Sequence, residues 1–181
     1  MSPKPILGYE HKKDKGVYTN YVLQFNKGGG LPKNKYQEPS EAVGFPKKDL
    51  SDALTLGTGG NAIVGYVNIK DNKHSVRCFK NKKGWDIAIH EPNDKDNKAE
   101  DVNIYITSDW DVNPKTKWHF LGRYDVEGIK DNLIHVDLGK IKLGRWIKVE
   151  GAKELLEPTG HWAGFELSAT FIKYPCMLNS N

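Results

Sequence analysis

The feature that most constrains this chain is a series of short apolar or alternating segments separated by clusters of Gly, Pro, Asn and Asp. Alternation of apolar and polar residues is typical of a strand with one buried face, and a helical period is hard to find anywhere in the chain. Breakers such as "NKGGGLP", "EPNDKDNKAED" and "EPTGHWAG" would each end a strand or a helix. The pattern predicts an all-β protein, an antiparallel β-sandwich of two packed sheets.

The predicted strands are residues 17–25, 62–69, 74–80, 85–91, 102–108, 117–124, 132–138, 145–151 and 165–174. The one plausible helical turn is "KKDLSDAL" at 47–54, where Asp49 or Ser51 can cap a short segment. Alternation within the strands predicts core faces. The residues expected on core faces include Trp85, Ile87, Ile89, Phe165, Leu167, Ala169 and Phe171. Trp146 alternates in register with Lys148 and Glu150, so we expect it to lie partly exposed.

Length and charge narrow the class of protein. A chain of 181 residues fits one sandwich domain over 1–181, with loose ends expected at 1–16 and 176–181. Lys and Arg number 27 against 23 Asp and Glu, and the two signs are interspersed. A nucleic-acid binder concentrates basic residues in a stripe, and only "FKNKKGW" at 79–85 suggests one. We therefore expect no nucleic-acid partner.

Membrane and export signals are not evident. No apolar run approaches the roughly 20 residues that span a bilayer, so no membrane span is expected. The first residues, "MSPKPILGYEHKKDKG", lack the apolar core of a secretory signal. Cys78 and Cys176 are the only cysteines, and one disulfide or two buried thiols are both open.

Four segments, read in order, carry a resemblance to a known group. They are "DALTLGTGGNAIVGY", "GWDIAIHEP", "VNIYITSDWDVNPKTKWHFLGR", and "VDLGKIKLGRWIKVEG" with "GHWAGFELSA". Over about residues 52–170 the chain resembles bacterial cell-surface and secreted β-sandwich modules of the galactose-binding-like, carbohydrate-binding type. The resemblance implies a jelly-roll sandwich at a cell surface or outside the cell, which binds carbohydrate without cleaving it. Glu166 and Ser168 stand where the group often has two aspartates.

Two sets of oxygen-bearing side chains are candidates for a structural calcium ion. "DWDVN" places Asp109, Asp111 and Asn113 at alternating positions, which lets one loop present three oxygen ligands. The alternative is a simple turn, because Asp and Asn favour turns through bonds to their own backbone. The second set, which matches acidic positions of the resembled modules, is Asp86, Glu91 and Glu166.

Loop aromatics are the candidates for ligand binding. Sugars present flat C–H faces, which Trp rings stack against while neighbouring polar groups bind the hydroxyls. Trp110 lies among Asp109, Asp111 and Asn113, and Trp162 follows His161. The alternative is that a loop Trp folds back and caps the open end of the sandwich, since Trp is highly buried on average.

The sequence therefore predicts a non-catalytic binding module for carbohydrate. Two other functions stay open: a protein-interaction or adhesion subunit, and a glycoside-acting hydrolase that uses Glu91 and Glu166. An enzyme is the less favoured reading, because no serine lies in a "GxSxG" elbow and neither cysteine has a recognisable catalytic neighbourhood.

Overall fold

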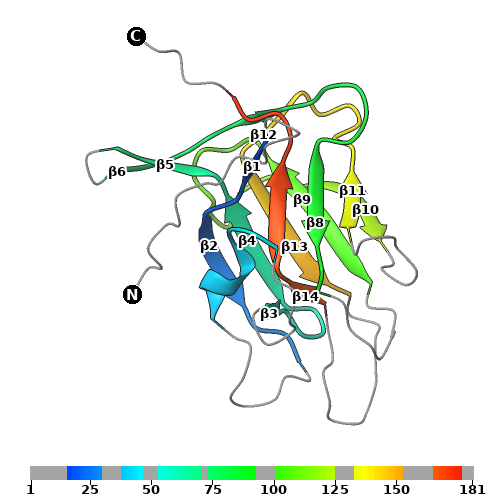
Figure 1. Ribbon diagram of the computed structural model, residues 1–181. Helices are drawn as coiled ribbons and strands as arrows, with labels where there is room; N and C mark the ends of the chain where they lie inside the picture. The colour runs from blue at the N-terminus through cyan, green and yellow to red at the C-terminus, as the bar shows by residue number, and fades with distance from the viewer. Residues whose placement is uncertain are drawn as a thin grey trace.

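The computed structural model describes residues 16–29, 38–46, 53–70, 73–92, 101–124, 133–152 and 165–176. Within these ranges the chain forms antiparallel strands, most of them in a four-stranded and a five-stranded sheet. The four-stranded sheet lies in front in Figure 1, and the five-stranded sheet passes behind it. The prediction of an all-β antiparallel sandwich is confirmed.

The four-stranded sheet contains, in spatial order, β1 (Val17–Tyr18), β15 (Ala169–Ile172), β8 (Ile87–His90) and β11 (Leu133–Val136). The five-stranded sheet contains β10 (His119–Tyr124), β9 (Val102–Thr107), β13 (Trp146–Gly151), β4 (Asn61–Gly65) and β2 (Tyr21–Asn26). Three smaller pairs are β12 (Leu143–Gly144) with β7 (Phe79–Lys80), β14 (Glu166–Leu167) with β3 (Leu54–Thr55), and β5 (Val67–Lys70) with β6 (Lys73–Val76). A 3-10 turn, η1, covers Pro39–Ala42.

The core lies between the two main sheets, where the apolar residues of each strand's inner face meet. The four-stranded sheet contributes Ile87, Ile89, Ile134, Val136 and Ile172, and the five-stranded sheet contributes Val22, Ala62, Val64, Ile104, Ile106, Ile147 and Val149. Burial of each large aliphatic side chain contributes about 1.5 to 3 kcal/mol. Of the predicted core residues, Ile87, Ile89, Phe165 and Leu167 belong to this cluster.

The predicted strand at 17–25 is two strands in different sheets. It leaves the four-stranded sheet after Tyr18 and enters the five-stranded sheet at Tyr21. At this corner the Asn20 side chain accepts a hydrogen bond from the N–H of Val67 (2.8 Å) and donates one to its carbonyl oxygen (2.9 Å). The side-chain bonds add to the backbone bonds from Thr19 to Thr170 and from Asn20 to Gly65 where the chain changes sheets.

Three predicted core residues instead lie on the outer face of the four-stranded sheet. Trp85, Ala169 and Phe171 pack there with Tyr18 and Ala88. The alternation of the last segment shifts at Ser168, where the chain passes from β14 to β15. Trp85 lies before β8, which begins at Ile87. The alternation of the strand therefore does not determine which face of the sheet the Trp85 side chain takes. Ala169 and Phe171 are buried as predicted, at 1% and 6% exposure, but they pack in this separate cluster and not between the two sheets, and Trp85 is only partly buried.

Trp146 is also placed differently from expectation, because it is buried, with 5% exposure. Its ring lies over Gly65, where an added Cβ would come within 2.6 Å of the indole. Ile63, Val67 and Val76 complete the buried cluster around it. Because Gly65 on the neighbouring strand has no side chain, the large Trp146 ring can pack against the outer face of the sheet.

The helical turn predicted at 47–54 falls mostly outside the described residues, and Leu54 begins strand β3. The expected loose ends at 1–16 and 176–181 also lie outside them, except for Gly16 and Cys176. Among the described helical residues, no segment has the length and apolar character that crossing a bilayer requires.

The two cysteines form a disulfide, which settles the alternative left open by the sequence. Cys78 and Cys176 are 98 residues apart in the chain, and their Cα atoms are 5.3 Å apart. The backbone N–H of Cys176 donates to the carbonyl oxygen of Cys78 (2.8 Å). The disulfide thus ties the end of the described chain to the segment that precedes β7.

Candidate functional site

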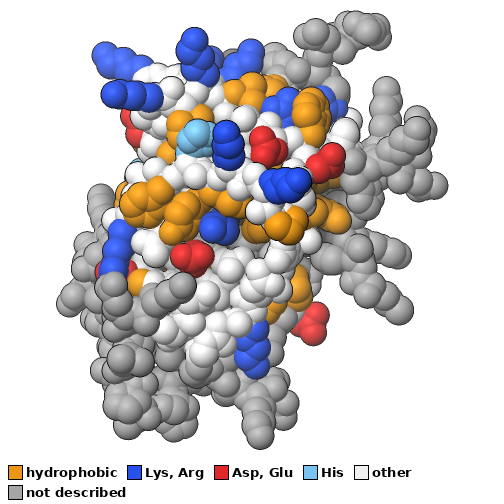
Figure 2. All heavy atoms as spheres, turned by 180° about the vertical axis from the view of Figure 1, so that it is seen from behind, with side chains coloured by type: hydrophobic (Ala, Val, Ile, Leu, Met, Phe, Trp, Pro, Cys, Tyr) orange, Lys and Arg blue, Asp and Glu red, His pale blue; other side chains and the backbone are white. Residues whose placement is uncertain are grey.

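An open cavity of about 370 Å³ lies on the outer face of the five-stranded sheet. Strands β2, β4 and β13 supply part of its lining, and the segment 112–118 supplies the rest. The lining residues are Gln24, Asn26, Asn61, Ile63, Val112, Asn113, Pro114, Trp118 and Lys148. Figure 2 shows the molecule from this side, with a band of hydrophobic side chains and, next to it, an area with few charged side chains. We call this cavity the polar groove.

Strand alternation explains why polar side chains face the polar groove. On β4 and β13 the inner positions are apolar, so the intervening residues Asn61 and Lys148 project outward. On β2 the register shifts between Val22 and Gln24, which leaves Leu23 as an extra, 37% exposed residue. This bulge brings Gln24 opposite Ile63 on the outer face.

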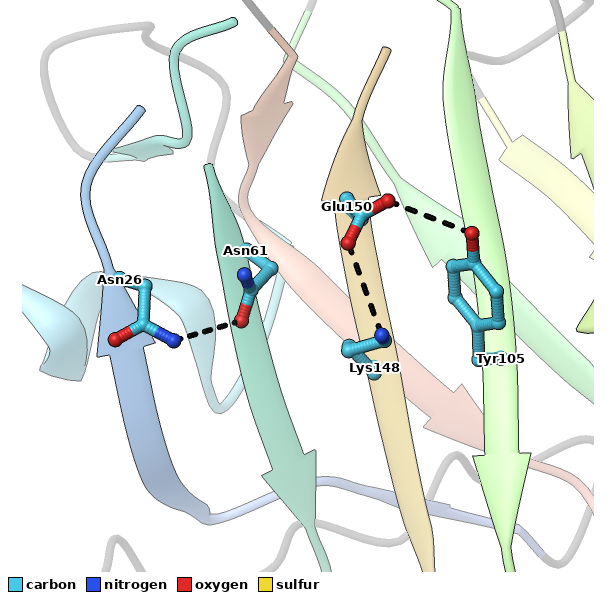
Figure 3. Close-up of polar contacts among 5 residues, drawn as sticks. All are labelled: Asn26, Asn61, Tyr105, Lys148 and Glu150. Atoms are coloured by element: carbon cyan, nitrogen blue, oxygen red, sulfur yellow. Dashed lines mark hydrogen bonds and ion pairs between the residues drawn. The ribbon is translucent and has the colours of Figure 1, made fainter. Parts of the chain in front are cut away.

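Two separate groups of polar contacts lie on this face, one joining β2 to β4 and the other joining β13 to β9 (Figure 3). Asn26 donates from Nδ2 to Oδ1 of Asn61 (3.2 Å). Lys148 Nζ lies 3.7 Å from Oε2 of Glu150, and the Tyr105 hydroxyl donates to Oε1 of the same carboxylate (3.4 Å). These contacts restrict the rotamers of side chains in and beside the polar groove.

The positive charge of Lys148 is paired. The Lys148 ammonium pairs with Glu150 and lies 4.1 Å from the ring centroid of Tyr105 and 5.3 Å from that of Trp118. Burial, together with the nearby Glu150 carboxylate, raises the pKa of Tyr105, so its hydroxyl stays protonated and can donate. The polar groove therefore presents one paired cation and several uncharged groups.

These side chains have the chemistry to bind a polyhydroxylated ligand. The carboxamides of Gln24, Asn26, Asn61 and Asn113 each carry donors and an acceptor, as sugar hydroxyls do. Trp118 adds an indole ring to the same lining, which can contact an apolar C–H face. The volume falls within the range of ordinary ligand pockets, about 300 to 1,000 Å³.

The loop predicted to hold calcium or sugar adopts the turn alternative at Asn113. Its side-chain oxygen accepts the backbone N–H of Lys115 (2.9 Å), and its own N–H donates to the Thr116 hydroxyl (2.9 Å). Asn113 lines the polar groove, whereas Asp109 and Asp111 are exposed and do not line it. The structure thus connects one member of this predicted set to the cavity.

Trp110 does not cap the sandwich, because 61% of it is exposed. The Arg145 guanidinium lies 3.7 Å from the centroid of its ring. The backbone carbonyl oxygen of Trp110 accepts a hydrogen bond from Nε1 of Trp146 (3.0 Å). Contacts with Arg145 and Trp146 therefore position this loop. Trp110 is not among the residues lining the polar groove. The other predicted platform, His161 with Trp162, lies outside the described residues.

In the second predicted calcium set, Asp86 lies apart from Glu91 and Glu166. Asp86 is 1% exposed, and its two oxygens accept the backbone N–H groups of Lys82 (2.9 Å) and Leu138 (3.0 Å). Glu91 follows at the far end of β8, roughly 17 Å away along an extended chain. Glu91 Oε1 lies 3.5 Å from the backbone nitrogen of Glu166, so these two are neighbours.

In the described part of the chain, no three His, Cys, Asp or Glu side chains form a group that could hold a metal ion. Asp86 has a structural role instead, since it joins two loops through backbone hydrogen bonds. Calcium binding stays a prediction.

Sequence reasoning missed most of the polar groove. No motif in the sequence marks Gln24, Asn26 or Asn61 as site residues, and the predicted strand at 117–124 includes Trp118, although β10 begins one residue after it. For Lys148, alternation predicts the same face as Trp146, which is expected to lie partly exposed. Gln24, Asn26 and Asn61 could be found from the polar residues at outward positions of their strands. The order of the strands, which brings these residues together, is not visible in the sequence.

Compared with models of known protein families and with curated proteins, the chain gives no match.

Proposed function

We propose that this chain is a non-catalytic carbohydrate-binding module of the galactose-binding-like type, and that the polar groove is its binding site. The observation that carries the proposal is the meeting of four carboxamides and one indole in a single open cavity. Carboxamides match the mixed donor and acceptor character of hydroxyl groups, and the indole matches the C–H face of a sugar ring.

The restraint on the lining side chains supports the same function. Asn26 and Asn61 bond each other, and Lys148 is held between Glu150 and two aromatic rings. Side chains that are already ordered lose less conformational entropy when a ligand binds. An open site of this kind is expected to bind one saccharide with micromolar to millimolar Kd, and several copies would be needed for tight attachment.

The disulfide supports a location in an oxidising compartment. Disulfides persist outside the cell and in the periplasm or secretory pathway, and are rare in a reducing cytosol. Cys78 and Cys176 are both paired. We therefore propose a cell-surface or extracellular setting, in which polysaccharides are the abundant hydroxyl-rich ligands.

A glycan array tests the proposal. The wild-type chain should bind a subset of glycans, and Asn61→Ala and Trp118→Ala should each lower that binding about fivefold or more, as expected for losing a hydrogen bond or a stacking contact worth about 1 kcal/mol. Asn68→Ala is the matched control, because Asn68 carries the same carboxamide on β5, outside the polar groove. Trp110→Ala tests the loop platform separately.

The outcomes separate the candidate functions. If the array shows no binding while pull-downs return a defined protein, the adhesion alternative replaces the carbohydrate proposal; exposed Phe120 and Trp110, at 57% and 61%, would then be the first contacts to mutate. The hydrolase alternative requires turnover of a polysaccharide that Glu91→Gln or Glu166→Gln abolishes. Only 4% of Glu166 is exposed, which does not favour direct contact with a substrate.

A further inference from the structure

A second cavity, of about 170 Å³, lies on the outer face of the four-stranded sheet, on the opposite side of the sandwich from the polar groove. We call it the aromatic pocket. It is lined by Tyr18, Trp85, Ala88, His90, Leu133, His135, Ala169 and Phe171. The carbohydrate-binding proposal uses none of these residues.

The aromatic pocket exists because two alanines occupy central positions on a sheet face that otherwise carries large side chains. Ala88 on β8 pairs with Phe171 on one side and His135 on the other. Ala169 on β15 pairs with His90 of β8. Short side chains at these positions leave a hollow, and the longer neighbours surround it.

The lining of the aromatic pocket favours a ligand whose ring carries few hydroxyl groups. Aromatic rings of Tyr18, Trp85 and Phe171 surround the hollow, and Phe171 lies 5.1 Å from Tyr18 and 6.2 Å from Trp85 between ring centroids. The polar groups of the described lining residues are the Tyr18 hydroxyl, the Trp85 indole N–H and the imidazoles of His90 and His135. An apolar cavity of about 150 Å³ is large enough to hold benzene. The pocket therefore fits one hydrocarbon ring better than a sugar.

The charge next to the aromatic pocket is positive. Lys173 Nζ lies 4.0 Å from the ring centroid of Trp85, and none of the described lining residues carries a carboxylate. Burial and, secondly, the charge of Lys173 lower the pKa of His135. Burial also lowers the pKa of His90. A lowered pKa favours the neutral form of both imidazoles at pH 7, and Lys173 is the charged group that lies against the Trp85 ring.

We propose that the aromatic pocket is a binding site for a small aromatic carboxylate, with its ring between Trp85, Tyr18 and Phe171 and its carboxylate directed toward Lys173. A cationic ligand of the same size would be repelled by the ammonium, which already occupies one face of Trp85. A neutral ring would keep the apolar contacts and lose the charge attraction.

Three probes of one shape test this site: phenylacetate, phenylacetamide and phenethylamine. Each is titrated into ¹⁵N-labelled full-length protein, and amide shifts are followed on β8, β11 and β15. Phenylacetate should shift amides of these strands and bind about two- to fivefold more tightly than phenylacetamide, which is the effect of one exposed charge pair. Phenethylamine should bind most weakly.

Two variants locate the binding. Lys173→Gln should lower phenylacetate affinity to that of phenylacetamide and leave phenylacetamide binding unchanged. Ala88→Leu should fill the hollow and abolish binding of both, while leaving glycan binding on the other sheet intact. The proposal is overturned if millimolar phenylacetate leaves these amides unmoved, or if acid and amide bind equally to the wild type. Neither outcome bears on the polar groove, so this site and the carbohydrate proposal fail independently.

Discussion

Removal of the disulfide should lower the stability of the fold by a large amount. In the chain-entropy account, a cross-link stabilises a protein by restricting the unfolded chain, and the effect grows with the length of the closed loop. Cys78 and Cys176 are 98 residues apart, for which this account gives about 4.7 kcal/mol at 25 °C. Most domains have only about 5 to 15 kcal/mol of total stability, so the loss would be a substantial fraction.

The perturbation is the double variant Cys78→Ser/Cys176→Ser, compared with the wild type in urea. Backbone contacts around the bond do not depend on it, since the N–H of Cys176 donates to the carbonyl of Cys78 and Phe79 pairs with Pro175. The free energy of unfolding, followed by Trp fluorescence, should fall by about 2 to 5 kcal/mol. A reducing agent should shift the wild type toward the variant and leave the variant unchanged. Equal unfolding free energies for the two proteins would refute the reasoning.

Three further predictions concern stability. Asp86→Ala leaves one buried and one partly buried backbone N–H group without an acceptor, so urea unfolding should show a loss of about 2 to 5 kcal/mol, and Asp86→Asn a smaller one. Gly65→Ala places a methyl group against the Trp146 ring and should cost about 1 to 3 kcal/mol, with a change in Trp fluorescence; an unchanged melting temperature would contradict this packing. Burial lowers the pKa of His90 and His135 below 6.5, so the unfolded chain binds more protons as pH falls through that value. Stability should be full above about pH 6.5 and decline toward pH 5, and His90→Asn should reduce the decline measured by urea midpoints.

The general architecture could be predicted because it depends on local pattern. Alternation in segments such as 102–108 and 145–151 places strands close to β9 and β13, and the inward residues Ile104, Ile147 and Val149 form the core. Where the chain changes sheets, alternation alone fails. Thr19 and Asn20 lie inside an apparently continuous strand, and the crossing depends on bonds to Val67, 47 residues away.

The candidate site was harder to predict because it combines residues from distant strands. Asn113 was expected at a site and lines the polar groove, but Asn26 and Asn61 come together only because β2 pairs with β4. Trp146 shows the same difficulty, since its burial depends on a glycine of the neighbouring strand. Side-chain chemistry is readable along the sequence, whereas strand order is fixed by long-range packing.

The most direct test of the carbohydrate-binding proposal is an NMR titration that follows side-chain NH₂ signals. The glycan that binds most strongly on the array is added to ¹⁵N-labelled protein, and the carboxamide peaks of Gln24, Asn26, Asn61 and Asn113 are assigned and tracked. We predict that these peaks and the indole N–H of Trp118 shift together with one Kd, while the carboxamide of Asn68 stays in place. A bound glycan that moves Asn68 or the Trp110 indole and leaves the polar groove unchanged would contradict the account.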